Sequence, residues 1–236
     1  MQMNIGGFAK NSLIDFPETI ACIVFTQGCN FFCPYCHNPD LVTGSSKGAG
    51  LSFDQGQVFD FLKKRQGLIE GVVITGGEPT LQKDLVPFCT AVKQMGYRIK
   101  LDTNGSRPEV LAQLLDKALL DFISMDIKTG LDHYSLVVSG IFDIQTIKES
   151  IALIMKAGAD YEFRTTCTRP FVNPEILNDI GKLVSGARRY VLAKCSRNVA
   201  VLDPGFIKSD DHFFSDKEMK WLKMCIDPYV QQTIVR

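Results

Sequence analysis

A run of eight residues near the N-terminus, from Cys29 to Cys36, contains three cysteines and limits the chemistry that this chain can support. Cys29, Cys33 and Cys36 are separated by three and then two residues. This spacing folds three thiolates around one point and supplies no fourth. An iron–sulfur cube held there would keep one iron open, and an open iron can bind a substrate.

Cysteines with this spacing could serve three other purposes: disulfide bonds, a zinc site or haem attachment. Disulfides are not expected, because the chain begins with no export signal and reduced thiols more often hold metal or do catalysis. His37 follows Cys36 and would complete a zinc site of three cysteines and one histidine, although such sites usually gather ligands from two separated segments. Residues 33–37 also fit the haem-attachment pattern, which would leave Cys29 unused.

A second motif follows a predicted buried strand at residues 72–75. The next residues are Gly76, Gly77, Glu78 and Pro79, and helical spacing follows over residues 83–95. Two glycines at the carboxyl end of a strand let a ligand approach the backbone closely. A plain strand-to-helix turn needs one glycine and no Glu78, whereas a carboxylate and exposed carbonyls suit a ligand that carries an ammonium group.

Length and charge narrow the class of protein. A chain of 236 residues that is 45% hydrophobic can bury its core as one domain over residues 1–236, although its length also permits two. The 26 basic and 26 acidic residues cancel and no basic run stands out, which argues against a nucleic-acid partner. No apolar stretch reaches membrane-spanning length, so we expect a cytoplasmic protein with no membrane contact.

Short apolar runs alternate with amphipathic ones along the chain. Strands are predicted at residues 20–26, 72–75, 98–102, 122–127, 161–166 and 190–193, with an edge strand near 232–235. Helices are predicted at residues 54–64, 84–95, 108–117, 144–157, 175–184 and 216–225, and a surface loop at 43–50. The alternation indicates a parallel sheet with helices outside it. Six units are too few for a closed eight-stranded barrel, and the pattern alone does not separate an open doubly wound sheet from a partial barrel.

Polar residues collect at the carboxyl ends of three successive predicted strands, where such folds carry their chemistry. They are Asp102, Thr103 and Asn104, then Asp126 and Lys128, then Glu162 and Arg164. The first group could cap a turn and Asp126 with Lys128 could be a solvated ion pair. Because such polar groups occur at three successive strand ends, they indicate a functional site rather than three separate structural features.

The cysteine loop and residues 75–79 together resemble the radical S-adenosylmethionine (radical SAM) superfamily. This resemblance implies a partial (β/α)6 TIM-type barrel with a core at about residues 18–195 and a terminal helix and edge strand at about 216–236. It implies that Cys29, Cys33 and Cys36 hold a catalytic [4Fe–4S] cluster. The open iron would then bind the amino and carboxylate groups of S-adenosylmethionine, with backbone of residues 76–79 at the amino group.

The strand-end residues are similar to those of one branch, the enzymes that activate glycyl-radical proteins. The resemblance implies that Asp102, Asn104 and Asp126 shape the cofactor pocket, that Lys128 faces the cofactor carboxylate, and that Arg164 lies near by. Tyr35 falls at the aromatic position where the backbone meets adenine. A lysine beside two carboxylates stays charged and can hold an anionic ligand group, which agrees with the assignment.

Other segments resemble the activating proteins of anaerobic ribonucleoside-triphosphate reductase. They are residues 5–8, 12–17, 25–30, 36–39, 77–82 and 161–166. Two segments depart from that group: residues 193–197 replace an expected Gln-Phe-Arg, and residues 168–170 replace a Val-Pro-Gly. These departures leave the cofactor chemistry intact and put the identity of the partner in question.

The resemblance implies an oxidoreductase that reductively cleaves S-adenosylmethionine and abstracts a hydrogen atom from a glycine of a partner enzyme, with flavodoxin or ferredoxin as the electron donor. The first partner to consider is anaerobic ribonucleotide reductase, and the alternative is a pyruvate formate-lyase type enzyme. A radical SAM enzyme for a small molecule or RNA would share the cofactor motifs. A zinc-binding interaction module would need neither Gly76–Gly77 nor the strand-end carboxylates. The roles of Cys167 and Cys195 stay open.

Overall fold

The computed structural model describes residues 2–43, 53–139 and 142–236. Within these residues, eight strands form one sheet whose strand order follows the chain. β1 (Ile5–Ser12) runs antiparallel to β2 (Ala21–Thr26), and each later pair of neighbours is parallel. The remaining strands are β3 (Gly71–Gly76), β4 (Arg98–Thr103), β5 (Phe122–Asp126), β6 (Asp160–Cys167), β7 (Tyr190–Lys194) and β8 (Thr233–Val235).

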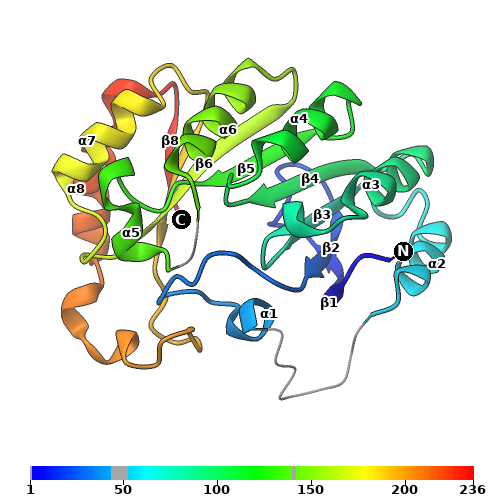
Figure 1. Cartoon of the computed structure of the whole chain (residues 1–236), viewed down its shortest axis with the longest axis horizontal. Coiled ribbons are helices and arrows are strands. Elements are labelled where there is room, and N and C mark those ends of the chain that lie inside the picture. Colours follow the sequence, from blue (N-terminus) through cyan, green and yellow to red (C-terminus); the bar gives the residue numbers. More distant parts are fainter. Residues whose placement is uncertain (1, 44–52, 140–141) are drawn as a thin grey trace.

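Helices connect the parallel strands. They are α1 (Pro39–Thr43), α2 (Gln55–Lys64), α3 (Leu85–Gln94), α4 (Pro108–Asp116), α5 (Tyr134–Val137), α6 (Ile144–Lys156), α7 (Pro174–Leu183) and α8 (Asp216–Ile226). Figure 1 shows the strands side by side in an arc, with α3, α4, α6 and α7 along its outer side. A curved parallel sheet with helices outside is the expected partial TIM-type barrel.

The two faces of the sheet bury different residues because side chains alternate along a strand. Val72 and Ile74 of β3 belong to the large core that includes Val58 of α2 and Phe88 of α3. Val73 between them belongs to a small second cluster with Phe16 and others. Phe16 lies between β1 and β2 and is fully buried, so an apolar cluster fills the inside of the arc at the start of the strands.

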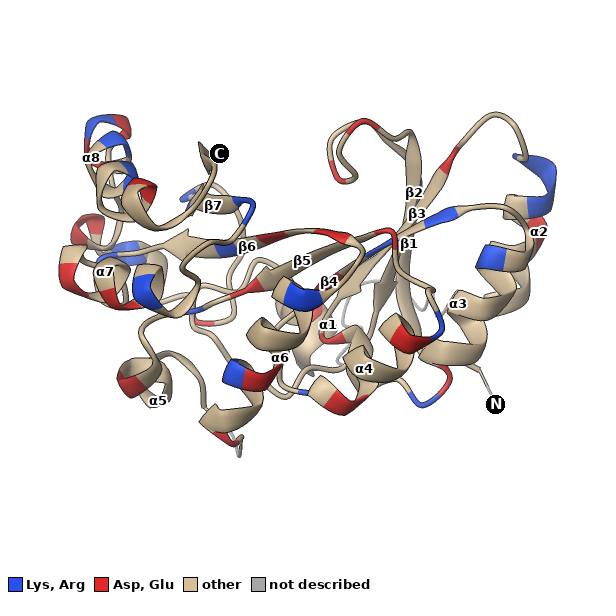
Figure 2. Ribbon diagram, turned by 90° about the horizontal axis from the view of Figure 1, so that it is seen from above, with Lys and Arg blue, Asp and Glu red and all other residues tan. Residues whose placement is uncertain are grey.

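Polar residues replace this apolar filling towards the carboxyl ends of the strands. Lys100 and Asp102 occupy alternate positions of β4 and form an ion pair, although Lys100 is buried. Figure 2 shows charged positions on β4 to β6 as well as on the helices, with acidic and basic residues interspersed. A polar interior above an apolar base leaves the carboxyl end of the sheet as the place for a site.

Side-chain caps fix the starts of several helices. Asp54, Asp143 and Asn173 accept hydrogen bonds from backbone N–H groups of α2, α6 and α7. Ser215 and Glu218 form a reciprocal capping box at the start of α8. These caps satisfy N–H groups that the helices themselves leave unpaired.

The fold class and the predicted strands and helices are confirmed, with boundary shifts of a few residues. The six β/α units run from β2 to β7, and the expected edge strand is β8. The antiparallel strand β1 was not predicted. Thr43 of the expected loop ends α1, and the rest of that loop lies outside the described residues. No helix in the described part of the chain is long and apolar enough to cross a membrane.

Candidate functional site

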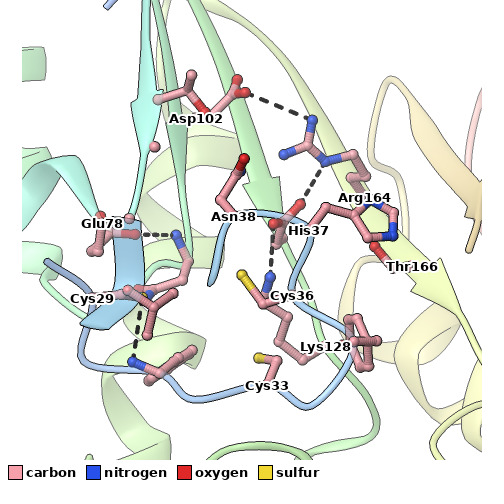
Figure 3. Close-up of a pocket in the computed structure, with 18 of the residues that line it drawn as sticks. Cys29, Cys33, Cys36, His37, Asn38, Glu78, Asp102, Lys128, Arg164 and Thr166 are labelled. Atoms are coloured by element: carbon pink, nitrogen blue, oxygen red, sulfur yellow. Dashed lines mark hydrogen bonds and ion pairs between the residues drawn. The ribbon is translucent and has the colours of Figure 1, made fainter. Parts of the chain in front are cut away.

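The carboxyl ends of the strands and the loop after β2 surround a cavity of 420 Å³. Every predicted site residue except Pro79 lines it, so the fold brings together groups that are up to 135 positions apart, from Cys29 to Arg164. Figure 3 shows the three cysteines on one loop, facing Glu78 and Asp102 on one side and Arg164 and Thr166 on the other. Pro79 instead begins a short 3-10 helix, Pro79–Leu81, behind the cavity wall.

The cysteine loop turns tightly enough to direct its three thiols to one side. The backbone N–H of Cys36 donates to the carbonyl of Cys33 at 3.0 Å, and the N–H of Phe31 donates to the sulfur of Cys29 at 3.4 Å. All three thiols are free of disulfides. Burial raises the pKa of Cys29 to about 12 and that of Cys33 to about 11, so binding a metal centre there must displace protons.

The arrangement differs from that of a mononuclear metal site. Among the described residues, no three His, Cys, Asp or Glu side chains converge as ligands of a single ion do. In an iron–sulfur cube each thiolate binds its own iron, so the cysteine sulfurs need not share one ion. The Nε2 atom of His37 lies 3.8 Å from the sulfur of Cys195, so the ring faces Cys195.

The segment after β7 packs against the cysteine loop. The N–H groups of Leu202 and Asp203 donate to the carbonyls of Cys36 and Pro34 at 3.1 and 3.0 Å. The ring of Tyr35 packs against Phe171 and Phe206, with ring centroids 5.8 and 6.0 Å away. The loop is therefore held from outside, while its cysteines face the cavity.

The glycines after β3 allow that loop to touch the cysteine loop. The N–H of Gly77 donates to the carbonyl of Thr26 at 2.9 Å, and the N–H of Glu78 donates to the carbonyl of Gly28 at 2.8 Å. A Cβ at Gly77 would lie 2.1 Å from the oxygen of Gly28, which no side chain tolerates. Gly76 has φ of +119°, a conformation that glycine adopts readily. The two glycines thus let backbone meet backbone at the cavity wall.

Glu78 joins the loops after β3 and β4. Its Oε1 accepts hydrogen bonds from the N–H and hydroxyl of Thr80 and, at 2.7 Å, from the hydroxyl of Thr103. Its Oε2 accepts from the N–H of Asn104 at 2.6 Å. Burial raises the pKa of Glu78, and these four donors oppose the rise. The carboxylate that the sequence suggested for an ammonium ligand is therefore already engaged by the protein.

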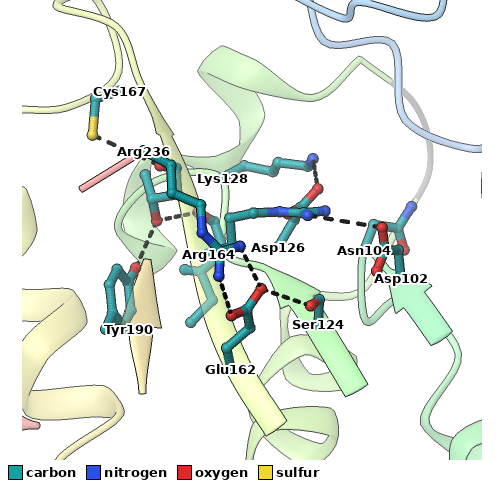
Figure 4. A network of polar contacts seen from close by, with 12 residues as sticks. Asp102, Asn104, Ser124, Asp126, Lys128, Glu162, Arg164, Cys167, Tyr190 and Arg236 are labelled. Carbon is teal, nitrogen blue, oxygen red and sulfur yellow. Dashed lines mark hydrogen bonds and ion pairs between the residues drawn. The ribbon is translucent and has the colours of Figure 1, made fainter. Parts of the chain in front are cut away.

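Asp102, Asp126, Lys128 and Arg164 form a chain of ion pairs across the cavity (Figures 3 and 4). The Nε of Arg164 donates to Oδ1 of Asp126 at 2.5 Å, and the Nζ of Lys128 donates to Oδ2 of the same carboxylate at 2.8 Å. Arg164 also lies 3.8 Å from Asp102. The four side chains are between 15% and 26% exposed, so each keeps an accessible part for a ligand.

The contacts within this chain of charges keep Asp126 and Lys128 ionised. Burial would raise the pKa of Asp126, but Arg164 and Lys128 outweigh it and hold the pKa well below its usual range. Burial would lower the pKa of Lys128, but Asp126 raises it well above its usual value. The cationic amine of Lys128 is thus fixed at the cavity wall, next to the cysteine loop.

Among the polar residues that line the cavity at the strand ends, Thr166, Lys194 and Arg236 were missed from the sequence. Arg236 follows β8, and its guanidinium lies 3.3 Å from the carboxylate of Glu162, which also accepts from Ser124 at 2.9 Å (Figure 4). Glu162 is 1% exposed, so Arg236 supplies the charge that its burial requires. The predicted edge strand was the available signal, because the residue after a parallel strand reaches the same end of the sheet as the other site residues.

The model of the radical SAM superfamily matches residues 23–184, which include the cysteine loop and the ends of β2 to β6. The chain belongs to the radical SAM superfamily. A protein of Methanocaldococcus jannaschii named as a glycyl-radical enzyme activating enzyme is 30% identical over 100% of this chain and 97% of its own length. The pyruvate formate-lyase-activating enzyme of Listeria monocytogenes is 36% identical over 46% of this chain and 47% of that enzyme.

Solved structures agree on the fold. The structure of Streptococcus suis SuiB bound to the precursor peptide SuiA has a TM-score of 0.63 at 15% sequence identity, and the match covers 88% of this chain and 45% of that one. At this identity the likeness concerns the fold alone.

As a radical SAM superfamily member the protein is an enzyme, and its cofactors are a [4Fe–4S] cluster and S-adenosylmethionine. The residues present fit this pair. Three free thiols of one loop open on the cavity, Gly76 and Gly77 line it with backbone alone, and the cationic Lys128, paired with Asp126, stands at its wall as a partner for a carboxylate.

Proposed function

We propose that this radical SAM enzyme activates a glycyl-radical enzyme by abstracting a hydrogen atom from one glycine of that partner protein. The observation that carries the proposal is the similarity to the M. jannaschii activating enzyme, which extends over the whole chain. Glycine suits such a reaction because it has no side chain to obstruct close approach. Its radical is stabilised by the flanking amide nitrogen and carbonyl.

In this function the chain's own residues would bind the cofactors, orient them and exclude water from the cavity. Cys29, Cys33 and Cys36 would hold the cluster, and the backbone at Gly76 and Gly77 would contact the amino group of the cofactor. Lys128, fixed by Asp126, would bind the cofactor carboxylate. When bound, the cluster and S-adenosylmethionine would supply the radical chemistry that hydrogen abstraction requires. The buried ring of Tyr35 at the cavity wall would help to exclude water.

We further propose that the partner is anaerobic ribonucleoside-triphosphate reductase. The support comes from the sequence, in residues 5–8, 12–17 and 25–30, which form β1, the loop after it, and the end of β2 with the start of the cysteine loop. The second candidate is a pyruvate formate-lyase type enzyme, since the Listeria activating enzyme matches about half of this chain.

The test uses anaerobically purified, cluster-loaded protein with S-adenosylmethionine and a chemical or flavodoxin-type reductant. We expect reductive cleavage of S-adenosylmethionine to 5′-deoxyadenosine, lost in Cys29→Ala, Cys33→Ala or Cys36→Ala and kept in Cys225→Ala, whose thiol lies on α8. With the reductase added, electron paramagnetic resonance should show a glycyl doublet.

Three outcomes would contradict all or part of the proposal. A doublet that persists when the reductase's radical glycine is changed to alanine would refute abstraction at that glycine. A doublet that forms only with a pyruvate formate-lyase type partner would overturn the reductase and keep the activating role. Absence of a doublet with either partner, combined with turnover on a small molecule or RNA, would reject the activating role altogether.

A further inference from the structure

A second hollow adjoins the cofactor cavity, and we call it the arginine groove. It has a volume of 680 Å³ and shares Lys194 and Arg236 with the cofactor cavity, so the two spaces meet at these cations. Its remaining lining comes mainly from the segment after β7 and the start of α8. A chain that extends from the cavity past Lys194 and Arg236 enters this groove.

The charge of the arginine groove favours an anionic ligand. Among the described residues, four cationic side chains line it, Arg169, Lys194, Arg197 and Arg236, against the two acidic side chains Asp210 and Glu218. Each of these cations already has an acidic partner: Arg169 pairs with Glu218 at 2.7 Å, and Arg236 pairs with the buried Glu162 at 3.3 Å. Arg197 pairs with Asp210, which is 89% exposed, and Lys194 pairs with Asp216, which is 86% exposed and does not line the groove. Exposed pairs of this kind contribute little free energy, so a ligand carboxylate can replace Asp210 or Asp216 and can share the guanidinium of Arg169 with Glu218.

Two arginines of the groove are held in place by aromatic rings. The guanidinium of Arg169 lies over Phe214 at 4.7 Å from the ring centroid, and that of Arg197 lies over Phe213 at 4.6 Å. Stacking fixes the guanidinium plane and leaves N–H groups at its edge for a carboxylate. Because the groups are already oriented, less conformational entropy is lost when a carboxylate binds.

The same residues are the ones that depart from the reductase-activating group. Arg169 stands in residues 168–170, and Lys194 and Arg197 stand in residues 193–197, the two segments that differ from the expected pattern. The cofactor motifs elsewhere match. Arg169 and Arg197 line only the groove, whereas Lys194 lies where the groove meets the cofactor cavity.

We infer that the arginine groove binds an extended segment of the partner protein that carries carboxylate side chains next to the substrate glycine. This inference rests on the proposed function, because it supposes a protein substrate. Carboxylates of the segment pair with Arg169 and Arg197, while Lys194 and Arg236 guide the chain into the cofactor cavity. A nucleic acid fits less well, because the rings of Phe213 and Phe214 are buried and offer no face for base stacking.

The experiment uses cluster-loaded protein with S-adenosylmethionine and two fluorescein-labelled synthetic peptides, one with glutamates around a central glycine and its twin with glutamines. Anisotropy should show that the glutamate peptide binds about tenfold more tightly, with a preference that falls as salt rises. The double variant Arg169→Gln, Arg197→Gln should bind both peptides equally. A single-stranded oligonucleotide serves as the third probe and should bind more weakly than the glutamate peptide.

Arg188→Gln is the matched control. Arg188 pairs with Asp160 and lies over the ring of Tyr161, so it makes the same two contacts at the opposite end of the strands. It should keep the peptide preference. The inference is overturned if the twin peptides bind equally or not at all, if the double variant keeps the preference, if Arg188→Gln loses it, or if the oligonucleotide binds more tightly.

Cleavage of S-adenosylmethionine without peptide separates this inference from the proposed function. The double variant should cleave at the wild-type rate, because neither arginine lines the cofactor cavity. A wild-type protein that fails to cleave S-adenosylmethionine contradicts the proposed function, whatever the peptides do. A wild-type protein that cleaves S-adenosylmethionine normally but shows no preference for the glutamate peptide contradicts only the inference about the arginine groove.

Discussion

At the scale of single residues, the carboxylate of Glu78 forms its hydrogen bonds with the protein itself. Its two oxygens accept four hydrogen bonds that connect the loops after β3 and β4. The sequence could place Glu78 at the end of a strand but not reveal its partners, because Thr103 and Asn104 lie on the next strand-end loop. A residue that first looks like a ligand contact is in this way a positioning residue.

We predict that Glu78→Gln lowers the free energy of unfolding by about 1–3 kcal/mol, because an amide NH2 group would then meet the N–H of Asn104 or leave a donor unpaired. The affinity for S-adenosylmethionine should fall as well, since the two loops lose their common anchor. Urea denaturation and a binding titration measure the two effects. The control is Glu70→Gln, at an exposed position before β3, where neither quantity should change.

The positive charge of Lys128 is maintained by its ion pair with Asp126, although the side chain is largely buried. We predict that Lys128→Met weakens S-adenosylmethionine binding by about 1.5–3 kcal/mol, the value of a charge-assisted hydrogen bond, and leaves cluster content near normal. Asp126 keeps Arg164 as a partner in this variant, so no buried charge is left alone. Calorimetric titration measures the affinity.

Lys93→Met provides the comparison for this prediction. Lys93 makes an ion pair with Asp121 at 2.9 Å with similar exposure, yet it lies on α3 and does not line the cavity. It should bind S-adenosylmethionine normally. Equal affinity in Lys128→Met and the wild type would show that Lys128 and Asp126 are only a structural pair.

At the scale of elements, the contact between the ends of β2 and β3 holds the site together. Gly77 and Gly28 touch through their backbones, so the cysteine loop and the glycine loop have one relative position. We predict that Gly77→Ala forces them apart, costs about 1–3 kcal/mol of stability as overpacking does, and lowers both cluster retention and cofactor affinity. Iron content and thermal unfolding measure the result.

Gly158→Ala tests whether any glycine replacement has this effect. A Cβ at Gly158 would meet nothing within 4 Å, so its stability should be unchanged or slightly higher. If Gly77→Ala and Gly158→Ala have the same stability and iron content, the contact between Gly77 and Gly28 does not fix the geometry of the site.

Strands β2 to β8 could be predicted because each is a short apolar run that helices cover. β1 could not, since Gly6, Gly7, Lys10 and Asn11 are uncommon in strands and its pairing with β2 contains irregularities. The short helices α1 and α5 are too brief to show a helical period. The residues of the cysteine and glycine motifs lie together at one cavity, whereas the placement of Lys194 and Arg236 there depends on strand pairing that only the fold shows.

At the scale of the whole molecule, the candidate cluster ligands lie at the margin of the core and outside the strands and helices that supply most of it. All three cysteines lie on one loop between β2 and α1, where Cys33 is buried in the large core and Cys29 and Cys36 pack against it, while most other core residues belong to strands and helices. Cluster removal should therefore not unfold the barrel, in contrast to small zinc domains, whose folding depends on the metal. The structural change on cluster removal should be confined to the cysteine loop and the residues that contact it.

We predict that chelation of iron under anaerobic conditions leaves the far-ultraviolet circular dichroism spectrum unchanged, because no strand of the sheet loses a partner. Hydrogen exchange should rise at Cys36, whose N–H bonds within the loop, and at Leu202 and Asp203, which donate to the loop from the segment after β7. Amides of β4 and β5 should keep their protection and serve as the internal reference. If exchange instead rises uniformly across the sheet, the cluster supports the whole fold, and the strands and helices do not hold the core without it.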